Sequence, residues 1–362
     1  MATSEGTWAY RDRFGDAFGR TYFRRLHPGV VASVGVGTYL GDPTDAVDER
    51  YREALVTAVE NGCNLVDTAI NYRCQRSERV VGRALRAASV DRDAVVVATK
   101  GGFLPFDGTP PDDPGGYVRE RFVEPGLVDP VDLARGSHCI APAFLDEMLD
   151  RSLDNLGLDA VDLYYVHNPE TQLAVRDRAA VYDALEDAFA RLEKRRAAGD
   201  VGAYGVATWE AFRVPPDDEA YLSLPAVLAR ARAAAERAGR DPEDHGLAAI
   251  QLPFNVAMAD AFTRRVHGDD GRSALEVARA ADVGVFASAS LAQGRLAAEL
   301  PPAVEAELAG DTRAQRAINF ARSAPGVTAA LVGASRPDHV AENLAAGTFD
   351  PLGARAFDAI FE

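Results

Sequence analysis

The side chains best suited to chemistry in this 362-residue chain stand where apolar stretches end. One stretch ends in Asp67, five residues before Tyr72, and two later stretches end in Lys100 and His167. An ammonium beside a phenol stabilises the phenolate, lowers its pKa and makes Tyr72 a better general acid. Asp67 would hold Lys100 and balance its charge, while His167 would orient a substrate oxygen. Such a set suits carbonyl reduction or alcohol oxidation, with hydride from a cofactor because no side chain can supply one.

Each of these residues also has a purely structural interpretation. Asp67 could cap the turn that follows it, Tyr72 could be an exposed loop aromatic, and His167 could be a hydrogen-bonded core histidine. Their joint placement at the ends of three successive apolar stretches favours the chemical interpretation. Lys100 adds weight because the chain has only one other lysine, Lys194.

The elements that must position these residues alternate along the chain. Continuous apolar runs predict parallel strands that are buried on both faces. The predicted strands are 30–37, 65–68, 95–100, 161–167, 203–208, 248–255, 283–290 and 328–333. Helical spacing lies between them, at 48–61, from residue 77, and at 144–156, 181–197, 272–281, 313–323 and 337–345. Eight such units predict an α/β fold, a (β/α)8 TIM barrel, whose chemistry takes place at the carboxyl ends of the strands.

We expect a single domain over residues 1–362, with two long insertions after the third and fifth strands. The first insertion, 101–141, is rich in Pro, Gly and Asp and is expected to form a lid or a binding loop. The second, 210–246, is partly helical. Residues 1–29 form an N-terminal arm across the bottom of the barrel, and 347–362 form a C-terminal tail.

Composition narrows the possible partners. The formal charge of −16 argues against nucleic acid and anionic membranes, since both attract basic surfaces. No apolar run reaches the length of about 18 residues that a membrane span needs, and the N-terminus lacks signal-peptide features, so a cytoplasmic protein is expected. Three cysteines without paired spacing argue against a disulfide framework and a structural zinc site. The excess of acidic residues with scarce lysine is typical of proteins adapted to high salt, although a GC-rich genome would also favour arginine.

Over residues 28–346 the chain resembles the aldo–keto reductase superfamily, in a branch with enlarged loops. The most specific motif is Asp67-Thr-Ala-x-x-Tyr72, followed by Ser77-Glu-x-x-x-Gly-x-Ala-Leu. Gly35-Val-Gly37-Thr38-Tyr39 resembles the first-strand signature of that family. Thr99-Lys100, the run that ends in His167, and Gly333-Ala-Ser-x-Pro-Asp-His-Val-x-Glu-Asn343 follow in the same order.

The resemblance implies a (β/α)8 barrel enzyme that reduces aldehydes or ketones with NAD(P)H. It implies that Tyr72 is the general acid, that Lys100 and Asp67 modulate it, and that His167 orients the substrate. Gln251 would hold the nicotinamide carboxamide, and the loop from Ser288 to Gln293 would cover the pyrophosphate. The full set of implied cofactor-binding residues is Gly37, Thr38, Thr208, Gln251, Ser288, Leu291, Gln293, Gly333, Ser335, Arg336, His339 and Asn343.

The resemblance favours NADP(H) over NAD(H). Arg336 follows Ser335 at the start of the last helix, and a guanidinium at a helix N-terminus suits a 2′-phosphate. Arg336 could instead be a solvated surface arginine. The chain departs from the family pattern at Ser288, where many members have an aromatic residue, and at Thr208, where an asparagine is usual.

A third departure bears on the substrate pocket, which we expect to include Tyr39, Arg73, His138 and Trp209. Arg73 replaces the glycine that follows the catalytic tyrosine in the family, so the pocket rim should be bulkier and more cationic. Together with Arg76 and Arg135, it hints at an anionic or sugar-acid substrate. Tyr117 and Phe212 are expected in the pocket wall as well. His138 and Cys139 could alternatively be a metal pair, but without a third ligand no metal site is expected.

The main alternative is a regulatory or sensor protein that binds NADP(H) on the same scaffold without turnover. Relatives of potassium-channel accessory subunits retain the same four residues. Turnover of a small-molecule carbonyl or alcohol separates the two hypotheses.

Overall fold

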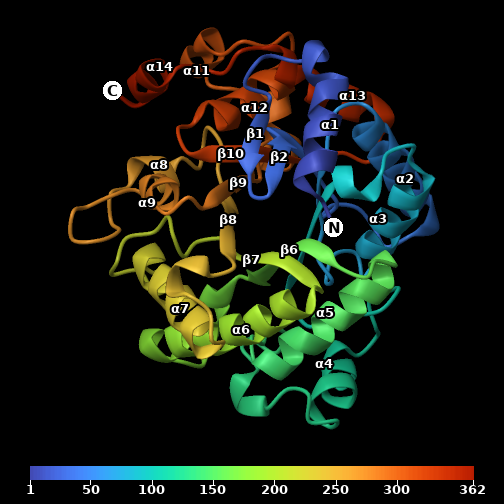
Figure 1. Cartoon of the computed structure of the whole chain (residues 1–362), viewed down its shortest axis with the longest axis vertical. Helices are drawn as coiled ribbons and strands as arrows, with labels where there is room; N and C mark the ends of the chain where they lie inside the picture. Colours follow the sequence, from blue (N-terminus) through green and yellow to red (C-terminus); the bar gives the residue numbers. More distant parts are fainter.

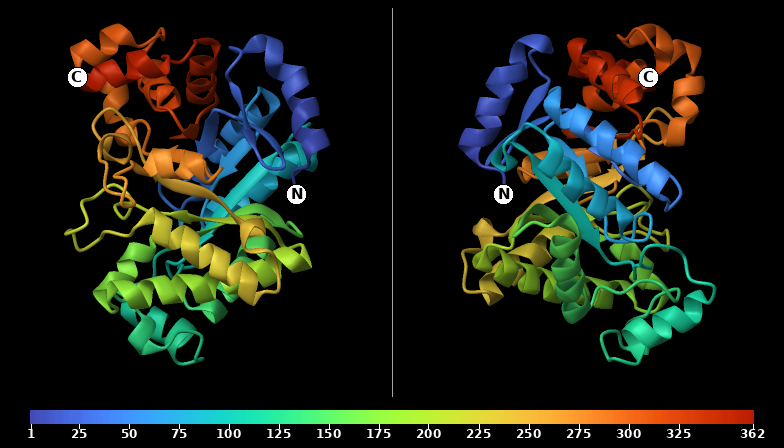
Figure 2. Two further views of the ribbon diagram at one scale, coloured as in Figure 1. Left: turned by 60° about the vertical axis from the view of Figure 1, so that its left-hand side comes forward. Right: turned by 90° about the vertical axis from the view of Figure 1, so that its right-hand side faces the viewer.

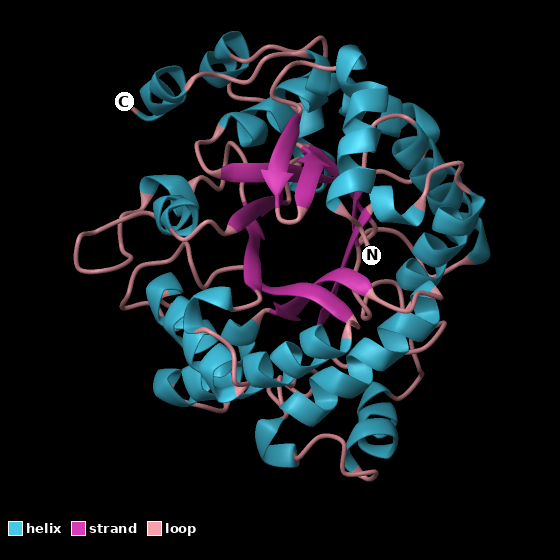
Figure 3. Cartoon of the chain, viewed as in Figure 1, coloured by secondary structure: helices cyan, strands magenta, loops and turns pink.

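A computed structural model, which describes all residues 1–362, shows a closed barrel of eight parallel strands inside a ring of helices (Figure 1, Figure 3). The predicted (β/α)8 fold is therefore confirmed. In barrel order the strands are β3 (Val34–Gly37), β4 (Leu65–Asp67), β5 (Val96–Gly101), β6 (Val161–His167), β7 (Val201–Ala207), β8 (Leu247–Pro253), β9 (Gly284–Ser288) and β10 (Val327–Gly333). Closure by the pairing of β10 with β3 leaves no open sheet edge.

A helix follows each barrel strand, as the sequence pattern predicts. The ring consists of α2 (Asp45–Glu60), α3 (Arg76–Ala87), α5 (Pro142–Leu156), α6 (Arg178–Ala198), α7 (Leu224–Arg237), α9 (Ala274–Ala280), α12 (Arg313–Ser323) and α13 (Pro337–Ala345). Their apolar faces and the outward faces of the strands form one core of 75 buried residues. Short helices α8 (Asp260–Thr263), α10 (Arg295–Ala298) and α11 (Pro302–Glu307) lie in the connections. None of the helices has the length and apolar character that crossing a bilayer requires.

The N-terminal arm closes the amino end of the barrel. Helix α1 (Ser4–Phe14) leads into an antiparallel hairpin of β1 (Phe23–Leu26) and β2 (Gly29–Ala32). Val31 of this hairpin belongs to the cluster of 11 buried residues that fills the barrel interior. The predicted first strand, 30–37, is wrong as one element, because the chain passes from hairpin to barrel at Ser33. That residue donates its N–H to Tyr22 and accepts from Ala330 of β10.

The expected second insertion, 210–246, contains a barrel helix. Its helical portion is α7, which packs against α6 on one side and α9 on the other, as a ring helix must. The segment between Thr208 and α7 has no regular structure, and a short 3-10 helix, Pro242–Asp244, lies between α7 and β8. The C-terminal segment, 347–362, contains α14 (Ala354–Asp358), and its Phe357 is fully buried against Phe320.

The segment predicted as an insertion after the third strand is the long connection between β5 and α5. It carries helix α4 (Pro114–Val118), which Figure 2 shows in blue-green at the outer edge of the molecule. Phe122 lies fully buried against Phe144 of α5 and fixes this excursion to the helix ring. Its two ends meet again at the barrel mouth, where Cys139 donates its N–H to the Gly102 carbonyl at 2.8 Å.

His138 ties the base of this loop to the end of β6. It is fully buried, and its Nε2 lies 2.7 Å from the carbonyl oxygen of His167. Its Nδ1 lies 2.9 Å from the amide nitrogen of Gln172, which also donates to the carbonyls of His138 and Asp132. Because two partners of this amide are carbonyl oxygens, the atom that faces Nδ1 is a donor. His138 is therefore neutral, with the proton on Nε2.

Burial lowers the pKa of His138 from 6.5 to about 4. Because the fold favours the neutral ring, His138 contributes stability in full above pH 6.5, and this contribution is lost as the pH falls toward 4.

Replacing His138 with glutamine should therefore remove part of the acid sensitivity of folding. Between about pH 7 and about pH 5, the wild-type free energy of unfolding should fall by about 2 kcal/mol more than that of the variant. Urea unfolding at a series of pH values measures both slopes. Parallel loss of stability in the two proteins would show that the folded protein does not hold His138 neutral.

Candidate active site

The structure brings Asp67, Tyr72, Lys100 and His167 together at the carboxyl end of the barrel. Lys100 Nζ donates to Asp67 Oδ1 at 2.6 Å and to the carbonyl oxygen of Thr68 at 2.8 Å. The same ammonium lies 4.8 Å from the centre of the Tyr72 ring. The Tyr72 and His167 rings lie 6.0 Å apart, edge to face. Asp67, Tyr72 and His167 line one cavity, while Lys100 is fully buried and reaches it only through its contacts with Asp67 and Tyr72. This convergence is expected at the carboxyl ends of neighbouring parallel strands.

The loop that carries Tyr72 depends on an unusual backbone. Arg73, Cys74 and Gln75 all have positive φ, at 50°, 56° and 66°, although none is glycine. Three successive left-handed residues are strained and persist only where tertiary contacts hold them. The Gln75 side chain supplies one such contact, since its amide donates to the Phe106 carbonyl at 3.0 Å.

Arg73 supplies a stronger contact, and its expected place at the pocket rim is wrong. Its side chain is only 1% exposed and forms an ion pair with Asp48 of α2. It also donates to the Asp42 carbonyl at 3.0 Å and lies over the ring of Tyr51. The left-handed backbone turns the guanidinium away from the mouth and under the loop. Arg73 therefore anchors the Tyr72 loop to α2 and contributes no charge to the pocket.

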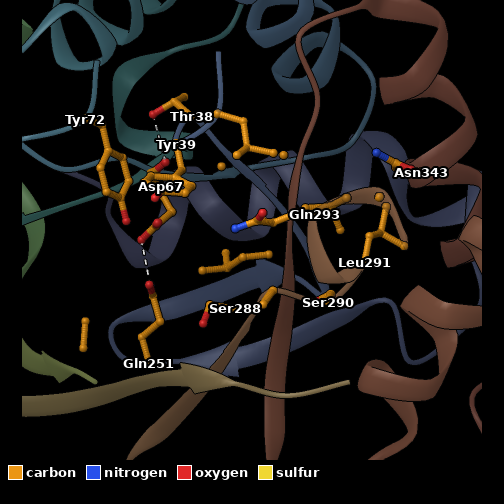
Figure 4. Close-up of a pocket in the computed structure, with 18 of the residues that line it drawn as sticks. Thr38, Tyr39, Asp67, Tyr72, Gln251, Ser288, Ser290, Leu291, Gln293 and Asn343 are labelled. Carbon is orange, nitrogen blue, oxygen red and sulfur yellow. Dashed lines mark hydrogen bonds between the residues drawn. The ribbon is translucent and has the colours of Figure 1, made fainter. Parts of the chain in front are cut away.

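The buried ammonium of Lys100 has a complete set of polar partners. Burial opposes its charge, but Asp67 and Tyr72 outweigh this effect, so the pKa of Lys100 is raised. The second carboxylate oxygen of Asp67 accepts from Gln251 Nε2 at 2.8 Å (Figure 4). The expectation that Gln251 holds a nicotinamide carboxamide stays a prediction. Gln251 lies at the cavity wall, with its amide nitrogen on Asp67.

The ionisation of Tyr72 differs from the sequence-based expectation. Burial raises the pKa of Tyr72, and the Lys100 charge, although it acts in the expected direction, only partly offsets that increase. The phenol therefore keeps its proton at neutral pH, which a general acid requires. Lys100 then acts on the phenolate that forms when the proton leaves.

His167 is held neutral beside the phenol. Burial, together with the charge of Lys100 and the nearby His138, keeps the pKa of His167 well below its ordinary range. Its Nδ1 is buried and has no hydrogen-bond partner. Phe103 packs edge-on against its ring, with centroids 5.1 Å apart. A neutral imidazole retains one N–H, with which it can donate a hydrogen bond to a substrate oxygen.

A cavity of about 950 Å³ extends from Tyr72 and His167 across the barrel mouth to the N-terminal part of α13. Figure 4 shows Ser288, Ser290 and Gln293 on the side away from Tyr72, with Asn343 beyond them. The expected cofactor residues that line it are Gly37, Thr38, Thr208, Gln251, Ser288, Leu291, Gln293, Gly333, His339 and Asn343. This elongated shape, with Tyr72 and His167 at one end and many polar side chains along its length, would accommodate a dinucleotide.

Two expected cofactor residues lie outside the cavity lining. Ser335 and Arg336 precede α13, and neither borders the cavity. The Arg336 guanidinium instead pairs with Asp338, with Nε 3.0 Å from Oδ1. Because the Arg336 side chain is exposed, it is free to adopt another rotamer.

The wall next to α13 also contains residues that the sequence analysis missed. Arg313 and Glu342 line the cavity at that end, and Asn71 lines it beside Tyr72 with a buried Oδ1 that has no partner. Asn71 could have been found from its place in the motif before Tyr72. Arg313 gives no such signal, because its position depends on how α12 packs against β10.

The substrate end is flanked by aromatic side chains. Tyr39 and Trp209 line the cavity and are 57% and 44% exposed. His138, which was expected here, lies behind His167 and does not reach the cavity, and Tyr117 and Phe212 do not line it either. His138 and Cys139 do not belong to a group of three or more His, Cys, Asp and Glu side chains that could hold a metal ion.

Comparisons with known proteins agree with this geometry. A sequence model of the aldo/keto reductase family matches residues 33–362. An aldo-keto reductase of Mycobacterium avium (strain 104) is 25% identical over 297 residues, which cover 82% of this chain and 76% of that protein. The 2,5-diketo-D-gluconic acid reductase B of Corynebacterium sp. (strain SHS752001) is 37% identical over 140 residues, which cover 38% of this chain and 35% of that enzyme.

The fold is also that of solved aldo-keto reductases. The crystal structure of an aldo/keto reductase from Klebsiella pneumoniae in complex with NADP and acetate superimposes with a TM-score of 0.61 at 21% identity. That alignment covers 94% of this chain and 95% of the other. A match of the family model to nearly the whole chain, on a closed parallel barrel, shows that the protein belongs to the aldo/keto reductase family.

Proposed function

We propose that this protein is an NADP(H)-dependent reductase that converts a small aldehyde or ketone to an alcohol, with Tyr72 as the proton donor. The observation that carries the proposal is the buried Lys100 ammonium, held by Asp67 at 2.6 Å and lying 4.8 Å from the Tyr72 ring. A buried charge beside a phenol is an arrangement that favours proton transfer. Because a regulatory protein can retain the same residues, turnover is what separates the two functions.

A bound reduced nicotinamide would supply the hydride, and the residues of this chain handle the proton. In the proposed step the carbonyl oxygen accepts hydrogen bonds from the Tyr72 hydroxyl and from the N–H of neutral His167. As hydride reaches the carbonyl carbon, the Tyr72 proton passes to the oxygen and the alcohol forms. The resulting phenolate is stabilised by Lys100 and later regains a proton from solvent. Asp67 and Gln251 keep the ammonium in place through this cycle.

The polar residues along the cavity would hold the cofactor. Thr38, Ser288, Ser290, Gln293 and Asn343 offer hydroxyl and amide groups along its length. The loop after β9 has left-handed residues at Ala289, Ala292 and Gln293, a backbone strain that is frequent at ligand clamps. These features support a dinucleotide in this cavity. The solved relative from Klebsiella pneumoniae carries NADP, which favours the phosphorylated form.

Replacing Tyr72 with phenylalanine should abolish most of the reduction. The expected loss is about 100- to 10,000-fold in kcat, the usual contribution of a positioned general acid. NADPH affinity, measured by the change in protein or cofactor fluorescence, should stay within about threefold because the ring remains.

Tyr117→Phe is the matched control, since it removes the same hydroxyl outside the cavity and should leave kcat unchanged. Full activity of the Tyr72 variant would remove Tyr72 from the chemistry. NADPH binding without turnover of any aldehyde or ketone by the wild type would favour the regulatory alternative.

Cofactor preference can be tested at Arg336. We propose that its guanidinium leaves Asp338 to bind a 2′-phosphate, so Arg336→Ala should weaken NADPH binding about tenfold, the value of a charge-assisted hydrogen bond at an accessible site. NADH binding should barely change. Titration of both cofactors into wild type and variant gives the ratio of dissociation constants.

Asp338→Asn provides the opposite change, because it releases the guanidinium from its present partner. This variant should bind NADPH at least as tightly as the wild type. Equal weakening of NADPH and NADH in the Arg336 variant would reject the 2′-phosphate role.

A further inference from the structure

A second cavity, of about 500 Å³, adjoins the substrate end of the first. The two share Phe103, Asn168 and Trp209 in their walls. It lies between the segment that follows β6 and the segment that follows Thr208, with the base of the long β5–α5 loop as its third wall. The second cavity is therefore a recess next to the Tyr72 end of the first one, with Trp209 at the boundary.

The second cavity is lined by carboxylates that lack counterions. Glu170, Glu210, Asp218 and Glu219 all border it, against the single cation Arg135. Elsewhere in the molecule many acidic side chains pair with arginine. None of these four carboxylates forms an ion pair, and neither does Arg135. Arg135, Glu210 and Glu219 are exposed and therefore well solvated, Asp218 is half-buried, and Glu170 is buried.

Glu170 gives an independent sign that a ligand belongs here. Its side chain is only 9% exposed, and its Oε1 accepts from Thr208 Oγ1 at 2.8 Å and from the N–H groups of Trp209 at 2.7 Å and Glu210 at 3.1 Å. All of its protein donors are thus on one oxygen. Oε2 is buried and has no partner. An unsatisfied buried carboxylate oxygen is costly, so a donor from a ligand would relieve it.

The chemistry of the lining indicates which ligand group fits. An ionised carboxylate only accepts hydrogen bonds, and an ammonium only donates them. Several uncompensated carboxylates in a recess focus a negative potential that attracts a cation. The partly exposed indole of Trp209 at the junction of the two cavities offers an aromatic face to a cation that passes it.

We propose that the second cavity is a distal substrate subsite for a protonated amine, and that the protein reduces carbonyl compounds that carry a basic group several bonds from the reacting carbon. The inference rests on the proposed reductase function and specifies its substrate class. It differs from the expectation of an anionic substrate. Arg73 and Arg76 are paired with carboxylates of α2 and lie outside both cavities, and Arg135, which lines the second cavity, is outnumbered there by four carboxylates.

Three aldehydes of similar size test this subsite. They are para-(dimethylaminoethoxy)benzaldehyde, its uncharged isostere para-(isopentyloxy)benzaldehyde, and the anionic para-formylphenoxyacetate. With saturating NADPH, the kcat/KM of the cationic aldehyde should exceed that of the isostere about tenfold, as expected for a charge-assisted contact. The anionic aldehyde should be the poorest of the three.

Variants locate the preference within the molecule. Glu170→Gln retains the acceptor for Thr208 but loses the charge, so the cationic-to-neutral ratio should fall to about one. Asp218→Asn should lower the ratio partly, and it serves if the first variant does not fold. Arg135→Met should raise the ratio. Glu307→Gln, an exposed change of equal charge on α11, should leave the ratio unchanged.

The outcomes separate failure of the subsite from failure of the proposed function. Reduction of the aldehydes without preference for the cation, or a ratio that is unaffected by Glu170→Gln, overturns the subsite alone. If none of the aldehydes is reduced, the reductase proposal fails. In that case, calorimetry with NADP⁺ present gives the dissociation constants of the same three compounds. Equal affinities, or tighter binding of the anionic aldehyde, would overturn the subsite.

Discussion

The buried ion pair of Lys100 and Asp67 is the interaction on which the rest of this site depends. Taking two charges out of water costs several kcal/mol per ion unless geometry and extra hydrogen bonds compensate. Compensation is present here, because Lys100 also donates to the Thr68 carbonyl and Asp67 also accepts from Gln251. These partners come from β4, β5 and β8, so the pair requires a closed barrel of the observed register. Loss of either partner would leave an uncompensated charge in the barrel mouth.

Two buried side chains next to the site hold Tyr72 and His167 in place. The chain is strongly acidic, yet its arginines are largely engaged with carboxylates. Arg73 shows what such pairing does for function, since its ion pair with Asp48 holds the left-handed loop from which Tyr72 projects. His138 has a similar positioning role but is neutral: its ring hydrogen-bonds to the carbonyl oxygen of His167. Tyr72 and His167 are thus each positioned by a buried neighbour that does not face the cavity.

The sequence was informative where function follows from backbone topology. Carboxyl ends of parallel strands must meet at one rim, so the convergence of Asp67, Lys100 and His167 followed from the strand order alone. Side-chain direction could not be read in this way. The inward turn of Arg73 requires a left-handed backbone and a carboxylate on another helix, and neither is visible in the local sequence. Gln251 was placed correctly at the cavity, but its contact with Asp67 depends on the distance across the barrel.

Three further features could not be predicted from the sequence, because they depend on tertiary packing. The helix α7 looked like an insertion because its long connection from β7 obscured the regular alternation of strand and helix. Glu170 could not be identified from the sequence, because what distinguishes it is a buried carboxylate oxygen without a hydrogen-bond partner. The pKa of Tyr72 was expected to be low from the nearby ammonium, whereas burial decides its direction. In each case the missing information was tertiary: which group packs against which, and how completely water is excluded.

The central claim is that Lys100 acts through Tyr72. A double-mutant cycle of Tyr72→Phe and Lys100→Met tests it most directly, with the single-turnover rate of aldehyde reduction by NADPH as readout and circular dichroism to verify the fold of each variant. The account predicts that Lys100→Met is harmful alone but that the double variant is no slower than Tyr72→Phe within about threefold, because residues that act as a unit are not additive. Losses that multiply in the double variant would show that the two residues act independently and would contradict the account.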